Sequence, residues 1–191
     1  MKKYLLSLMS IAMMALVCVS FVSCNDDDDK GGGSGKGSGS TTIGGKSYKL
    51  PYATYVPGGE YEGQYYNLIM VSNLDTNHPE KVSLKSKWTY MTIIISQDHP
   101  WGYNSIPSGS FDAHVEFSIN ETLSGEEGDD YKEGWAEGPI LISKNGDTYT
   151  LEFSSDYAYM EGQGQDQITV SLKYKGGIGD GTEIWGEYDE K

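Results

Sequence analysis

Histidines are the first side chains to consider for chemistry, because imidazole is a frequent general base and metal ligand in proteins. The chain has three of them, His78, His99 and His114. Two of the three directly precede a proline, which is typical of loops. The third, His114, alternates with Asp112 and Glu116, so these three side chains share one face if the segment is a strand. Such a trio could bind zinc, but a solvated polar face is the simpler interpretation, and we predict no metal site and no cofactor.

Carboxylates are abundant, with 28 Asp and Glu residues in the 191-residue chain. A dense group of them lies in GEEGDDYKEGWAEG, residues 125–138. A glycosidase needs two carboxylates that face each other across a cleft, and calcium needs several oxygen ligands. The stretch matches no such spacing, and the serine-elbow, HExxH and EF-hand patterns are absent from the sequence. The sequence therefore predicts a solvated acidic segment and a non-enzymatic protein.

Three aromatic side chains in expected loops are candidates for ligand binding. Trp101 and Tyr103 lie in DHPWGYNSIPSG, and Trp135 lies in the acidic stretch. Exposed rings on loops of a rigid β scaffold can stack on the apolar faces of sugars, and Pro100 would limit the freedom of the loop around Trp101. The alternative is that each tryptophan folds back as a lid over one end of the core. We take Trp101, Tyr103 and Trp135 as the ligand-binding candidates.

The start of the chain has the form of a secretory signal peptide. A basic Met-Lys-Lys start is followed by an apolar run over 4–22 and then by Ser23 and Cys24. A membrane-spanning helix is the alternative, because the run is about as long as a bilayer is thick. The other cysteine, Cys18, lies inside the segment that cleavage would remove, so the mature chain would carry one thiol and no disulfide.

Val22-Ser23-Cys24 resembles the lipobox of bacterial lipoproteins, in which the chain is cut before the cysteine and the thiol is lipidated. The acidic run that follows is similar to the short stretch that directs lipoproteins of the Bacteroidota to the cell surface. Its residues are Asp26, Asp27, Asp28 and Asp29. The resemblance implies lipid attachment at Cys24, an outer-membrane location, and a domain that faces the cell exterior without spanning the bilayer.

Residues 30–42, KGGGSGKGSGSTT, offer no side chains that could build a core. Such a Gly/Ser-rich segment is a flexible coil with a span of roughly 20 Å. We therefore expect three parts. They are a signal peptide (1–23), a lipidated cysteine with its acidic run and tether (24–42), and one all-β domain (43–191).

The expected domain has a hydrophobic period of two, which indicates strands. In 109–120 the odd positions from Phe111 to Ile119 are apolar or small and the even positions are polar, and 166–176 repeats this pattern with Ile168, Val170, Leu172 and Tyr174 inward. Further strands are expected near 47–56, 64–74, 84–97 and 181–188.

Segment 138–153 has the pattern of a β-hairpin. Its Asn145-Gly146 pair predicts a type I′ turn, in which both central residues need positive φ angles. That turn would pair Ile142 with Tyr149 and Ile140 with Leu151 on one face.

About eight antiparallel strands must cover one core, and no window shows helical spacing. The sequence predicts an antiparallel β-sandwich, with a meander β-barrel as the alternative. The formal net charge is −14 and arginine is absent. Because nucleic-acid phosphates need basic patches, this charge excludes a nucleic-acid partner.

Three pieces of the domain also resemble a group of small Bacteroidota lipoproteins. They are IGGKSY at 43–48, IPSGSF at 106–111 and the hairpin turn at 144–149. Members of that group mostly lack an assigned activity, so the resemblance implies fold and location. We expect a surface-anchored binding module for a glycan, or an accessory to glycan uptake. The alternative is an adhesion or interaction lipoprotein that docks on a partner or host surface protein.

Overall fold

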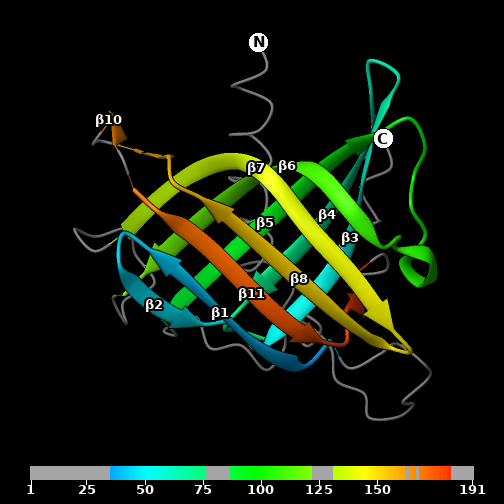
Figure 1. Ribbon diagram of the computed structural model, residues 1–191, viewed down its shortest axis with the longest axis horizontal. Coiled ribbons are helices and arrows are strands. Elements are labelled where there is room, and N and C mark those ends of the chain that lie inside the picture. The colour runs from blue at the N-terminus through cyan, green and yellow to red at the C-terminus, as the bar shows by residue number, and fades with distance from the viewer. Residues whose placement is uncertain (1–34, 76–86, 122–130, 162–163, 167, 182–191) are drawn as a thin grey trace, which may run out of the picture.

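The computed structural model describes residues 35–75, 87–121, 131–161, 164–166 and 168–181 (Figure 1). The strands are β1 (Gly37–Ile43), β2 (Lys46–Lys49), β3 (Tyr52–Tyr61), β4 (Gln64–Ser72), β5 (Trp88–Gln97), β6 (Gly109–Asn120), β7 (Tyr131–Asn145), β8 (Thr148–Ser155), β9 (Ala158–Met160), β10 (Gly164–Asp166), β11 (Val170–Gly176) and β12 (Gly179–Asp180). A short 3₁₀ helix, η2 (Tyr103–Ser105), is the only helix in these ranges. The expectations for Cys24, for Asp26 to Asp29 and, apart from Gly181, for a strand at 181–188 lie outside the described residues.

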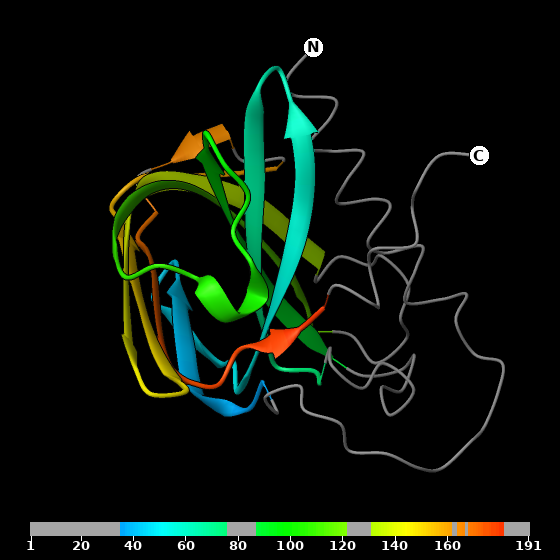
Figure 2. The same ribbon diagram turned by 90° about the vertical axis from the view of Figure 1, so that its right-hand side faces the viewer.

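All twelve strands belong to one strongly curled sheet (Figures 1 and 2). Its order is β12-β3-β4-β5-β6-β7-β8-β11-β1-β2, with β9 paired to β7 and β10 paired to β9. The prediction of an all-β protein is confirmed. The pairing is antiparallel except between β12 and β3, which run parallel.

Side chains on the inner face of the curl form the core. The inward positions predicted for two strands are buried, and they are Ala113, Val115, Phe117 and Ile119 on β6 and Val170, Leu172 and Tyr174 on β11. Phe111 and Ile168 are half-buried and pack against the same core. Each fully buried side chain of this kind contributes about 1.5–3 kcal/mol. The same alternation leaves Asp112, His114 and Glu116 on the outer face.

The β7–β8 hairpin forms where it was predicted, but its register is different. Gly146 and Asp147 make the turn, Asn145 pairs with Thr148, and Ile142 therefore pairs with Leu151 instead of Tyr149. Gly146 has a φ of 60°, whereas Asp147 does not have a positive φ. One positive φ at the first central position fits a type II′ turn, so the predicted type I′ turn is wrong. The pairing moves by two residues, so every side chain keeps its predicted face.

The expected tether begins to pair before residue 43, because Gly37 to Thr42 form most of β1. This strand pairs with β11 and β2 through backbone groups, which need no large side chains. Its glycines are needed, since a Cβ at Gly37 would lie 2.5 Å from Lys175 O and a Cβ at Gly39 would lie 2.4 Å from Leu50 O. A composition that suits a flexible linker here allows close backbone packing.

Strand β7 has three neighbours, because it pairs with β6, with β8 and, through its residues 134–136, with β9. Gly134 makes the third pairing possible. A Cβ at this position would lie 2.2 Å from Tyr159 O and 2.6 Å from Phe117 Cζ. Glycine therefore lets β9 approach β7 and places Tyr159 opposite Trp135.

Gly134→Ala should lower the free energy of unfolding by about 1–3 kcal/mol, because the added methyl group forces a backbone carbonyl and a core ring to move. Gly177→Ala is the matched control, since its Cβ would meet nothing closer than 3.6 Å. Urea denaturation of both variants measures the difference. Equal midpoints would contradict the close approach at Gly134.

Candidate binding site

Trp101 is buried, with 6% of its surface exposed, and belongs to the core. Its backbone N–H donates to Asn67 Oδ1 at 2.8 Å, and its ring packs edge-on against Phe111 with centroids 5.1 Å apart. The Tyr55 hydroxyl donates to Trp101 O at 2.8 Å, and burial is the main cause that raises the pKa of Tyr55 to about 12. These contacts draw the loop after β5 onto the core, so Trp101 does not have the exposed ring that was expected of it.

The three aromatic candidates do not form one site. Tyr103 begins η2, is half-buried and packs against the same core as Trp101. Trp135 lies on the outer face of β7 and is 37% exposed. Of the three, Trp135 is the ring that remains available to a ligand.

Trp135 is the middle member of an aromatic row that crosses three strands of the outer face. Its ring centroid lies 5.3 Å from that of His114 on β6 and 5.8 Å from that of Tyr159 on β9. The interplanar angles are 28° and 24°. These centroid distances indicate offset stacking, which leaves part of each face uncovered. Tyr159, like Trp135, is 37% exposed.

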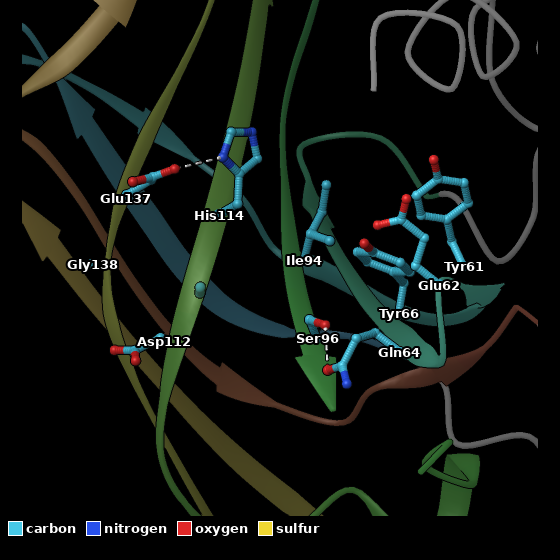
Figure 3. Close-up of a pocket in the computed structure, with 11 residues that line it drawn as sticks. Tyr61, Glu62, Gln64, Tyr66, Ile94, Ser96, Asp112, His114, Glu137 and Gly138 are labelled. Atoms are coloured by element: carbon cyan, nitrogen blue, oxygen red, sulfur yellow. Dashed lines mark hydrogen bonds and ion pairs between the residues drawn. The ribbon is translucent and has the colours of Figure 1, made fainter. Parts of the chain in front are cut away.

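A hollow of about 610 Å³ lies beside the aromatic row, and His114 belongs to both (Figure 3). Ile94 and Ser96 of β5 line it between two groups of side chains. One group comes from the β3–β4 hairpin and comprises Tyr61, Glu62, Gln64 and Tyr66, and the other comes from β6 and β7 and comprises Asp112, His114 and Glu137. We call it the acidic hollow, after Glu62, Asp112 and Glu137.

The β3–β4 hairpin extends further than the sequence indicated, and this extension brings Tyr61 and Glu62 to the acidic hollow. Glu62 and Gly63 have φ angles of 53° and 76° and connect Tyr61 to Gln64, which is the pattern of a type I′ turn. Tyr61 is 40% exposed, and the neighbouring carboxylate of Glu62 is the main cause that raises the pKa of its hydroxyl.

A small apolar cluster adjoins the acidic hollow, and Ile94 and Tyr66 belong to both. Val56, Leu68 and Ile94 are buried on the outer face, and Tyr66 packs against them. On the opposite side of the hollow, His114 lies between two carboxylates. Its Nε2 is 3.7 Å from Glu116 Oε1, and its Nδ1 is 3.7 Å from Glu137 Oε1. Within the described ranges, no group of three or more potential ligands is arranged to hold a metal ion.

A second hollow, of about 340 Å³, has lysines around it, and we call it the lysine hollow. Lys49 and Lys87 line it, and Lys46 forms an ion pair with Glu121, a further lining residue. The hydrogen bond from Lys46 is the main cause that lowers the pKa of Glu121. The two hollows therefore differ in the sign of the charges that border them.

Sequence reasoning did not find Tyr61, Tyr66, Glu137 or Tyr159 as site residues. The alternation of Asp112, His114 and Glu116 indicated the correct face of β6. No pattern in the sequence near these residues shows that this face lies beside the β3–β4 hairpin or β9. The pairing of β4 with β5, of β5 with β6, of β6 with β7 and of β7 with β9 brings these residues together.

Comparison with protein-family models, with curated proteins and with solved structures finds no match to this chain. Across the described part of the chain, no helix has both the length and the apolar character needed to cross a bilayer.

Trp101→Ala should lower the free energy of unfolding by about 3–5 kcal/mol, because it leaves a cavity beside Phe111 in the core. Trp135→Ala removes a partly exposed ring and should cost much less. Thermal and chemical denaturation of the two variants would test this order. A Trp101→Ala variant as stable as the wild type would show that the ring does not support the core.

Proposed function

We propose that this protein is a lipid-anchored, non-enzymatic binding module of the cell surface, and that its ligand is a glycan. The observation that carries this proposal is the aromatic row beside the acidic hollow. Sugars have an apolar face that stacks on an aromatic ring and a rim of hydroxyl groups that needs hydrogen-bond partners. Trp135 and Tyr159 supply partly exposed rings, and Gln64 and Ser96, which hydrogen-bond to each other, supply polar groups in the adjoining hollow.

The rigidity of the scaffold supports binding of this kind, because stacking on a ring that is already held in place costs little ordering entropy. We propose that the scaffold is the meander-barrel alternative and not the sandwich. Backbone bonds join the start of β1 to the start of β3 at the far side of the sheet. Ala53 N–H donates to Gly35 O at 2.8 Å, and Gly37 N–H donates to Pro51 O at 2.7 Å.

The anchor follows from the resemblance of Ser23-Cys24 to a lipobox. Because Gly35 already accepts backbone and side-chain hydrogen bonds, the tether is proposed to comprise residues 25–34. A Gly-rich segment of this length spans about 17 Å. A tether of this kind would lift the domain from the outer membrane and leave it free to turn.

Cys24→Ala should abolish lipid attachment, because the remaining thiol, Cys18, lies in the proposed signal peptide. Cells grown with labelled palmitate and then fractionated would show the outcome. Labelled variant protein in the outer membrane would refute the proposed anchor.

Replacement of Asp26 to Asp29 by alanine is the companion variant in the same experiment. It should keep the lipid and lose exposure on the cell surface, as read by protease treatment of intact cells. Equal cleavage of this variant and the wild type would show that the acidic run is only a spacer and does not direct export.

Trp135→Ala should weaken glycan binding about five-fold or more while the fold is kept, because one aromatic contact contributes about 1 kcal/mol. Tyr157→Ala is the matched control, since Tyr157 is 59% exposed and lies outside the aromatic row. A glycan array probed with the full chain would select the oligosaccharide, and isothermal titration would compare the variants. Unchanged affinity in a folded Trp135→Ala variant would exclude the aromatic row, and an array without any bound glycan would exclude the proposed ligand class.

A further inference from the structure

We infer that the glycan recognised at this site carries positive charge, as a saccharide with free, protonated amino groups does. This inference rests on the proposed function and adds the chemical class of the ligand. It is drawn from the charges, the rings and the shape of the acidic hollow and the aromatic row together.

The ionisable groups of the acidic hollow are strongly biased towards carboxylates. Glu62, Asp112 and Glu137 line it from three different strand regions, and Glu116 lies on the far side of the shared His114. No lysine is among the described residues that line it, and the chain contains no arginine. An ammonium group in this hollow would meet acceptors from two sides.

The excess of carboxylates in the acidic hollow is a local property and does not follow from the net charge of the chain alone. Lysines are present on the described surface, but Lys49 and Lys87 border the lysine hollow, and Lys46 pairs with Glu121 there. Lysines therefore border the second hollow, whereas none of the described residues that line the acidic hollow is a lysine. An anionic saccharide, such as one with carboxylate or sulfate groups, would be repelled from the acidic hollow.

Aromatic rings add a second attraction for a cation. Tyr61 and Tyr66 line the hollow, and a cation over the face of a tyrosine ring is attracted by the ring quadrupole. Ile94, which is buried together with Val56 and Leu68, gives the hollow an apolar part against which the sugar ring that carries the amine can pack. Carboxylates and tyrosines around one cavity form a setting that suits an alkylammonium group.

The shape favours an extended chain of sugars over a single small cation. His114 belongs to the acidic hollow and also begins the aromatic row, which continues through Trp135 to Tyr159 on β9. A saccharide that places an amine in the hollow can therefore lay its next rings on the row. A lone ammonium ion would use only the hollow.

The test compares three tetrasaccharides with the same β-1,4 linkage that differ at carbon 2. The glucosamine tetramer carries an ammonium group there, the N-acetylglucosamine tetramer an amide, and cellotetraose a hydroxyl. Titration calorimetry with the full chain at about pH 6 keeps Asp and Glu ionised. We expect the glucosamine tetramer to bind roughly five-fold or more tightly than the other two, with a preference that declines as salt is added.

Glu137→Gln should remove much of this preference, since it deletes one exposed carboxylate without changing the shape of the hollow. Glu152→Gln on β8 is the control for net charge, because Glu152 is exposed but does not line the hollow. It should bind all three tetramers as the wild type does.

The possible outcomes separate this inference from the proposed function. Equal or tighter binding of cellotetraose would overturn the charge preference and keep the glycan site. Failure of all three tetramers to bind, together with an empty glycan array, would overturn both. A tetralysine peptide is the last ligand to be tested, because it carries positive charge but no sugar ring. If it binds as tightly as the glucosamine tetramer, the site recognises charge alone, and the inference that the ligand is a saccharide is wrong.

Discussion

The ladder between β6 and β7 is the constraint on which the core and the candidate site both depend. Twelve residue pairs hold the two strands in one register, from Gly109 with Ile142 to Asn120 with Tyr131. Because successive side chains of a strand point to opposite faces, the register that buries Val115 also holds His114 outside. A slip by one residue would put a histidine in the core. The burial energy of the inner face therefore also fixes the positions of the outer-face groups.

Two further elements complete the outer face around this ladder, and each depends on glycine. Strand β9 lies against β7 because Gly134 has no side chain, and this contact sets Tyr159 beside Trp135. The β3–β4 hairpin reverses at Glu62 and Gly63, both with positive φ, and presents its aromatic and acidic side chains to the hollow. The proposed site is thus a composite of side chains from several strands and one hairpin turn of the sheet.

Alternation along single strands was sufficient to predict an all-β fold and the buried positions of β6 and β11, because burial of one face is a local pattern. The hairpin turn was misplaced by one residue, since Asn145-Gly146 and Gly146-Asp147 both suit a tight turn. The sequence left open whether Trp101 binds a ligand or closes one end of the core, and it could not decide between the two because the Asn67 amide that holds Trp101 lies 34 residues away. The aromatic row could not be predicted from the sequence for the same reason, because only the pairing of β9 with β7 makes Tyr159 a neighbour of Trp135.

We expect a saccharide to bind on the outer face and not at the loop of Trp101 or in the lysine hollow. The most direct measurement is a map of NMR chemical-shift changes as the glucosamine tetramer is titrated into the full chain. The largest changes should occur at the indole of Trp135 and at the amides of His114, Glu137 and Tyr159. Changes confined to Tyr103 and its loop, or to the residues around Glu121, would contradict it.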